Sequence, residues 1–261
     1  MTSPLSFLLA LEFPPIQNIV EWPAFLFEGT PFAFNKIALG YVFATVATLV
    51  IFMMAGKRRA LVPKGVQNVA EASVDFIQKG IIEQAIGHGG NPFAPFLTAL
   101  FFFVFFNNIL EVIPGWQMPG NARMAMPIFL GVLVLILFVV TGIRSQGPGT
   151  YLKNSLFPPG LPKGLYVLVT PIELISTFLV RPFSLAVRLF ANMLAGHILL
   201  ISFAVLAAAL WVASWQAIFL PLPFVMLVGL TGFEILVAFL QAYIFTILTA
   251  VYIGGALHPE H

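Results

Sequence analysis

Long stretches without a formal charge constrain the fold of this chain more than any other feature. Ile37 to Gly56 is the first of them, twenty residues without an Asp, Glu, Lys or Arg. A helix needs about 20 apolar residues to cross the hydrocarbon core of a bilayer. Only 8% of the 261 residues are charged and 60% are hydrophobic, whereas a soluble domain carries about a quarter charged residues. The stretches are too long for barrel strands, so the sequence predicts an all-α integral membrane protein.

The same composition excludes several classes of protein. A soluble globular enzyme and a disordered chain are excluded by the hydrophobic content, and a disulfide scaffold by the absence of cysteine. The net charge of +2 comes from scattered basic residues, so we expect no nucleic-acid partner. No repeat or composition break is visible, which predicts a single membrane domain over residues 1–261. We expect no catalytic residue, metal or cofactor in this chain.

Flanking charges predict how the first span is oriented. Residues 1–36 form a tail with three glutamates and no basic residue before Lys36, whereas Lys57, Arg58, Arg59 and Lys64 follow the span 37–56 at once. The apolar run 7–11 has no basic flank and no cleavage site, so we expect no signal peptide. Because loops rich in Lys and Arg stay in the cytoplasm, the tail is predicted to lie outside.

The segment 65–86 has a different pattern. Apolar residues recur at helical spacing while charged residues occupy the other faces, which predicts an amphipathic helix on the inner membrane surface. His88 follows it and is interpreted as an ordinary loop residue. A helical hairpin is predicted over 93–143, with spans from Phe93 to Ile113 and from Met124 to Ile143. A Pro/Gly-rich loop carrying Arg144, Lys153 and Lys163 then follows in the cytoplasm.

The remaining apolar stretches, within 165–257, are too long for ordinary crossings. Pro171 to Val212 covers 42 residues, about 63 Å of helix at ~1.5 Å per residue, against a hydrocarbon core of ~30 Å. Each stretch is therefore either a hairpin of two short helices or one long, steeply tilted helix. Neither stretch has a turn dipeptide near its middle, and Pro182 alone would only kink a helix. We favour a C-terminal hairpin of two long tilted helices, after three spanning helices and one amphipathic surface helix.

Polar residues inside these stretches are the candidate functional residues, because charges in a span are costly. Arg188 and Asn192 are four residues apart and share one helix face. Glu234 and Gln241 are seven apart and form one stripe, two turns along the last helix. His197 follows Arg188 by nine residues, which at roughly 100° per residue places it on the opposite side of the helix. This layout predicts a permanent cation near mid-membrane with a polar path leading away from it.

Simpler interpretations remain open for most of these residues. Asn192 and Gln241 are compatible with interhelical hydrogen bonding alone, and His197 with ordinary packing. Glu111, near the outer end of the second span, is compatible with simple hydration. Arg181, close to the inner end, is best interpreted as an interfacial anchor, and Glu173 is similarly ambiguous. The small residues beside Arg188 either let a sliding surface approach or pack within the chain: Ala191, Ala195 and Gly196.

Three motifs resemble those of one family. The stretch Arg181-Pro-Phe-Ser-Leu-Ala-Val-Arg-Leu-Phe-Ala-Asn-Met-Leu-Ala-Gly-His197 is similar to the signature of the ATP synthase subunit a family. Gln241-Ala-Tyr-Ile-Phe-Thr-Ile-Leu-Thr-Ala-Val-Tyr252 resembles the family's second signature, and Asn108-Ile-Leu-Glu-Val-Ile-Pro114 resembles its motif at the outer end of an earlier span. The resemblance covers Ile37 to the C-terminus.

The resemblance implies a role for each candidate residue. Arg188 corresponds to an essential arginine, a buried guanidinium that faces a rotating ring of c subunits and separates two aqueous half-channels. Gln241 is its neighbour on the last helix, and Asn192 is the polar residue one turn on. The residues implied for the outer half-channel are His197, Glu234, Asn108 and Glu111. Glu173 is a weaker candidate for the cytoplasmic half-channel, since it stands one position off the spacing to the proline seen in some members of the family.

The resemblance also implies partners. The partners are the c-subunit ring, b-type peripheral stalk subunits, membrane lipid and, through the complex, a soluble F1 head that makes ATP. Because the composition is not that of a transit peptide, we expect a bacterial plasma membrane, and the flanking charges predict an outer N-terminus and a cytoplasmic C-terminus. A secondary transporter that binds an anion at Arg188 is the main rival, although no paired half-repeats are visible. A structural scaffold is a second rival, but it would have little use for Glu234 and His197 at depth.

Overall fold

The computed structural model describes most of the chain, namely residues 23–27, 29, 33–57, 63–87, 89–113, 115–118, 120–157, 162–211 and 215–258. Several features predicted from the sequence lie outside these residues: most of the N-terminal tail, Arg58, Arg59, and the loop residue His88. Within the described residues the regular elements are helices, and one isolated bridge joins Leu26 to Phe34.

Five helical segments of the described chain are long and apolar enough to cross a membrane. They are Lys36–Lys57, Asn91–Ile109, Ala125–Gln146, Tyr166–Leu210 and Ala217–Leu257. The all-α membrane fold and the five predicted apolar helices are therefore confirmed. The second span ends earlier than predicted, because α6 (Ala94–Ile109) gives way to a turn at Leu110. Glu111 consequently lies in a turn rather than in the last turn of a helix.

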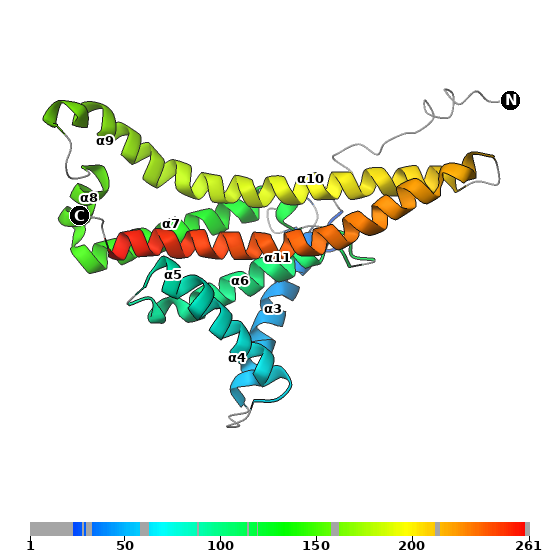
Figure 1. The fold of residues 1–261 in the computed structure, drawn as a ribbon, viewed down its shortest axis with the longest axis horizontal. Coiled ribbons are helices and arrows are strands. Elements are labelled where there is room, and N and C mark those ends of the chain that lie inside the picture. The colour runs from blue at the N-terminus through cyan, green and yellow to red at the C-terminus, as the bar shows by residue number, and fades with distance from the viewer. Residues whose placement is uncertain are drawn as a thin grey trace.

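The last two apolar stretches form two long helices rather than four short ones. Three consecutive elements, α9 (Tyr166–Ile175), η5 (Ser176–Val180) and α10 (Arg181–Leu210), make one continuous helix of 45 residues. The partner helix α11 (Pro221–Leu257) has 37 residues, about 55 Å at ~1.5 Å per residue. Figure 1 shows α10 and α11 side by side along the longest dimension of the molecule, joined at one end through η6 (Trp215–Phe219).

A π-helical turn interrupts the first of these long helices. In η5 the Arg181 backbone N–H bonds to the carbonyl of Ser176, five residues back instead of four. Pro182, the second residue of α10, explains the position of this turn, because proline has no N–H and its ring clashes with the carbonyl four residues earlier. A π turn accommodates one extra residue and changes the helical register by about 100°.

The core of the molecule lies among α6, α7 (Ala125–Gln146), α10 and α11: α11 contacts the other three, and α7 also contacts α10. Figure 1 shows α6 and α7 running along one side of the α10–α11 pair, with α3 (Lys36–Lys57) and α4 (Val66–Ile77) projecting away from it. The side chains between the four helices are aliphatic and aromatic, and include Leu97, Val104, Val134, Phe138, Leu185, Leu189, Phe245 and Ile253.

The predicted amphipathic segment is a helix made of α4, η1 (Gln78–Ile82) and α5 (Glu83–Ala85). Ala70, Ile77 and Ile81 are buried against the rest of the chain, whereas Val69 stays exposed. On the polar side, Lys79 pairs with Asp75 at 2.5 Å in an exposed position. The helix is confirmed, and its placement on the inner membrane surface stays a prediction.

The prediction of a Pro/Gly-rich loop after α7 was wrong in one respect, because part of this segment is helical. α8 spans Pro148–Leu156. Gly147, with a φ of 82°, ends α7 in the left-handed region that favours glycine. Pro148 then starts the new helix at its first position, where the missing N–H costs nothing.

Candidate functional site

Arg188 lies near the middle of the 45-residue helix, on the surface of the chain. Its side chain is exposed and makes no hydrogen bond or ion pair with the residues that the structure describes. The expectation of a buried guanidinium is therefore wrong for the single chain, because α11 and α7 pack against other faces of α10. Any burial of this cation has to come from a neighbour outside the chain.

Asn192, one turn beyond Arg188, connects the two long helices. Its side-chain Nδ2 donates a hydrogen bond to Oε1 of Gln241 at 2.8 Å. Gln241 is 2% exposed, and its own Nε2 has no partner among the described residues. The bond agrees with the interhelical interpretation of these two residues, and it also places Gln241 beside the arginine-bearing face of α10.

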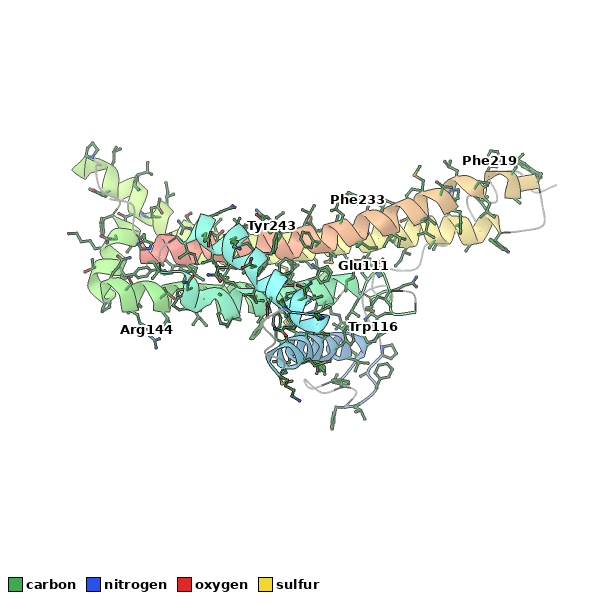
Figure 2. All side chains as sticks on the ribbon, turned by 60° about the horizontal axis from the view of Figure 1, so that its bottom comes forward. Glu111, Trp116, Arg144, Phe219, Phe233 and Tyr243 are labelled. Carbon is green, nitrogen blue, oxygen red and sulfur yellow. The ribbon has the colours of Figure 1, made fainter. Side chains whose placement is uncertain are left out.

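Three titratable side chains meet on the side of α10 opposite Arg188, where spacing had placed His197 alone. His197 Nδ1 lies 3.5 Å from Glu111 Oε1. Glu234 of α11 interacts electrostatically with both of them. Glu111, His197 and Glu234 are 2%, 5% and 4% exposed, and we refer to them as the His197 cluster. Figure 2 shows Glu111 beside the long helix pair, level with the middle of α11.

Gly196 allows the His197 cluster to form. A Cβ atom added at Gly196 would overlap the carboxylate of Glu234. The neighbouring Ala195 is exposed on the other side of the helix, with Ala191 one turn before it. The three small residues therefore divide into two groups: Gly196 serves packing within the chain, and the two alanines border Arg188 on the exposed side.

A second polar contact extends the His197 cluster toward the turn between α6 and α7. Asn108 accepts a hydrogen bond at its Oδ1 from Nδ2 of Asn121, at 2.7 Å, and both side chains are buried. Sequence reasoning missed Asn121, because an asparagine after a glycine in a turn resembles an ordinary turn residue. Its only sequence signal was its place just before the span that begins at Ala125.

Several buried polar atoms in this region have no hydrogen-bond partner among the described residues. Leaving such an atom unpaired costs about 1–3 kcal/mol, so a group of them indicates a place that water or a proton can reach. The atoms are Asn107 Oδ1, Asn108 Nδ2, Glu111 Oε2, Asn121 Oδ1, and Glu234 Oε2.

A polar pocket of about 550 Å³ lies where α10 begins and α11 ends. Glu173, Thr177 and Arg181 line it from the long helix, with Arg181 stacked 5.5 Å from the ring centre of Tyr252. Tyr151 of α8 lines it too, and burial raises the pKa of its hydroxyl. That hydroxyl therefore stays protonated at neutral pH. Sequence reasoning missed Tyr151, because it lies in the segment expected to be a loop.

The π turn bears on the position of Glu173. The resemblance puts Glu173 one position off the spacing to the proline seen in some members. η5 lies between Glu173 and Pro182 and accommodates one extra residue. With this turn in the helix, Glu173 lines the pocket.

The described residues contain no group of three or more His, Cys, Asp or Glu side chains suited to a metal ion. The chemistry of the arrangement is that of proton transfer. An imidazole and two carboxylates lie close together at one level, a fixed cation faces outward at another, and a polar pocket opens at one end.

Comparison with known proteins gives consistent similarities. The family model described as ATP synthase A chain matches residues 38–254. ATP synthase subunit a of Frankia alni is 42% identical over 229 residues, covering 87% of this chain and 79% of that protein. The subunit a of Rhodococcus erythropolis is 42% identical over 91% of this chain and 88% of its own. That of Maricaulis maris is 40% identical over 95% and 98%.

Proposed function

Because this chain belongs to the ATP synthase A chain family, we propose that it passes protons between two aqueous half-channels and a ring of c subunits. In this proposal Arg188 separates the half-channels, and proton flow through them drives rotation and ATP synthesis. The chain itself catalyses no reaction, since ATP is made on a soluble head elsewhere in the complex.

The exposure of Arg188 is the observation that carries the proposal. A charged side chain in the middle of a membrane helix costs about 2.5–3.5 kcal/mol on insertion scales, so it is unstable against lipid. Arg188 has no partner within the described chain. A neighbouring carboxylate would satisfy it, and the flanking exposed alanines leave room for a neighbouring helix to approach. A substrate site inside the chain, as in a secondary transporter, would instead need Arg188 to point inward.

The outer half-channel is assigned to the buried face of α10. The His197 cluster offers groups that accept and release protons, and the unpaired polar atoms around Asn108 extend from it toward the α6–α7 turn. Gln241 and Asn192 lie between this region and Arg188 along the helix pair. Protons would enter from the turn, reach Glu234, and pass to a ring carboxylate beside α11.

The inner half-channel is assigned to the 550 Å³ pocket. Glu173, Thr177 and the Tyr151 hydroxyl give it a polar lining. It opens near the basic residues that the positive-inside rule places in the cytoplasm. With this orientation the N-terminus lies outside and the C-terminus inside a bacterial plasma membrane.

The electrostatics of the cycle follow from these positions. A ring carboxyl is neutral while it faces lipid, because a bare carboxylate there is expensive. Beside Arg188 the opposite charge favours the ionised form, so the proton leaves into one half-channel. The next carboxylate takes a proton from the other half-channel before it returns to lipid. The driving force is ~2.3 kcal/mol per charge for each 100 mV.

Replacing the arginine tests the proposal. We expect Arg188→Ala to abolish ATP-driven acidification of inverted membrane vesicles, while the complex, including b-type stalk subunits and the soluble head, still co-purifies. Arg144→Ala is the matched control, because Arg144 is exposed at the end of α7 and projects away from the helix pair (Figure 2). Normal acidification by Arg188→Ala in an assembled complex would contradict the proposal.

A further inference from the structure

The short turn η3 (Gly120–Ala122) is buried at the meeting point of four helices. It contacts α3, α6, α7 and α10, and all three of its residues are buried. A turn between two membrane helices normally lies at the surface, where water satisfies its polar groups. This turn is instead wedged into the interior, beside the end of α6 that carries Asn108 and Glu111.

Contacts from α3 hold this turn in place. The Tyr41 hydroxyl donates a hydrogen bond to the Gly120 carbonyl at 2.6 Å. Lys36 Nζ donates to the Gly115 carbonyl at 3.1 Å and lies 5.6 Å from the ring centre of Trp116. A Cβ atom at Gly120 would come within 2.8 Å of the Tyr41 ring. The position of η3 is therefore fixed by the first span as well as by its own hairpin.

Asn121 is the residue that η3 directs into the interior. It is fully buried and donates to Asn108 at 2.7 Å, which leaves its Oδ1 and the Asn108 Nδ2 unpaired. A side-chain amide has both donors and an acceptor and does not titrate. It can therefore orient water molecules on both sides without trapping a proton as a carboxylate would.

The unpaired atoms belong to residues that two side-chain contacts and one backbone hydrogen bond connect. Asn121 bonds to Asn108, which is three residues before Glu111 on the same chain segment, and Glu111 contacts His197. Buried polar atoms in native proteins nearly always find a partner, either protein or ordered water. We infer that η3 forms a wall of the outer half-channel and that Asn121 is a positioning residue, which orients the water through which protons reach the His197 cluster. This inference rests on the proposed function.

The test uses the whole ATP synthase in vesicles, with ATP synthesis driven by an imposed proton gradient. We expect Asn121→Leu, which keeps the branching and the number of side-chain heavy atoms but removes both polar atoms, to lower the synthesis rate about tenfold. Hydrolysis of ATP by the soluble head after its release from the membrane, and the recovery of the complex, should not change. Thr48→Val is the matched control, since Thr48 is buried in α3 and bonds only to its own helix at Ala44.

A second variant distinguishes positioning from packing. Asn121→Asp has nearly the same shape, but adds a titratable group to the path. We expect the synthesis rate to acquire a new dependence on the pH of the outer side, with the dependence on inner pH unchanged. A residue with a purely structural role would not change the outer pH profile. Asn121→Asp also decides the matter if Asn121→Leu does not assemble.

The outcomes separate this inference from the proposed function. Wild-type synthesis by Asn121→Leu, or a wild-type outer pH profile in Asn121→Asp, would overturn the role of Asn121. If Arg188→Ala is inactive in the same vesicles, either of these results for Asn121 would leave the proposed function standing. Normal pumping by Arg188→Ala would instead remove the premise of both.

Discussion

The two sides of α10 treat polar side chains in opposite ways. On the buried side, His197 contacts Glu111 and lies close to Glu234, all within the chain. On the exposed side, Arg188 has no partner among the described residues and is bordered by Ala191 and Ala195. The buried side is a site that the chain builds from its own helices, whereas the exposed side is half of a site.

This difference shows which part of the function depends on a partner. The polar groups on the buried side already have their neighbours within the chain, so the effect of a substitution there can be interpreted from the fold of the chain alone. An exposed cation at the centre of an apolar helix is stable only when another molecule covers it. Substitutions on the two sides should therefore fail for different reasons, one by disturbing the chain and the other by disturbing the assembly.

The largest effect is expected from two neighbouring small residues that point to opposite sides. Gly196→Leu would push into the Glu234 carboxylate and destabilise the α10–α11 pair, since overpacking costs about 1–3 kcal/mol or more. We expect loss of proton pumping together with a lower yield of the chain. Ala195→Leu should leave the yield unchanged and impair pumping only, because its side chain is exposed.

Yield in membranes, by immunoblot, and vesicle acidification are the two measurements. Equal yields for Gly196→Leu and Ala195→Leu would contradict the difference between the two sides of α10, because both sides would then tolerate a larger side chain equally well.

The next effect comes from removing the imidazole of the His197 cluster. We expect His197→Leu to lower proton flux about 10²-fold, the lower range for loss of a positioned acid–base group. Glu111→Gln should be less than additive with it, since the two side chains are in contact. A double-mutant cycle on proton-driven ATP synthesis measures this coupling, and full additivity would argue that the two residues act separately.

Lengthening the helix at the π turn should have an intermediate effect. Because η5 already accommodates one extra residue, inserting an alanine after Phe178 would rotate Glu173 by about 100° relative to Arg188. We expect synthesis to fall about tenfold, which corresponds to losing one hydrogen bond to a charged group. Replacing Phe178 with Leu keeps the length and serves as the control. Comparable rates for the insertion and the replacement would show that this register is unimportant.

The smallest effect is expected at the bond between the two long helices. Asn192→Leu removes the hydrogen bond to Gln241 and leaves a buried amide unpaired, at a cost of about 1–3 kcal/mol. Because Asn192 is itself exposed, we expect a loss toward the lower limit, about fivefold in pumping rate. Asn192→Ser, which can still accept or donate through water, should recover part of it. No recovery by serine would indicate that side-chain shape, not hydrogen bonding, matters at this position.

Much of the fold could be predicted from local sequence. The spans were identified because each is long and apolar, and the long hairpin because neither last stretch contains a turn signal near its middle. The helix α8 was missed because proline and glycine also begin and end helices, and single-sequence patterns do not distinguish these uses from a loop. The π turn was missed because its cause, Pro182, predicts a kink equally well.

The candidate site could be predicted only in part. Spacing placed Arg188 and His197 on opposite sides of one helix, because helical periodicity is a local property. It could not show that Asn121 reaches Asn108, since this contact depends on how deeply the α6–α7 turn is wedged between four helices. Nor could it show that Arg188 faces away from α11, since that depends on how α10 rotates as it packs.

The positions and lengths of the membrane helices, and the residues that share a helix face, are encoded in local sequence. These properties follow from hydrophobicity and helical geometry over a few consecutive turns. Which face turns inward, and which polar groups meet across helices, is set by tertiary packing. Those outcomes depend on close contacts such as that of Gly196 with Glu234. Because Gly196 has no side chain, the Glu234 carboxylate can pack against α10.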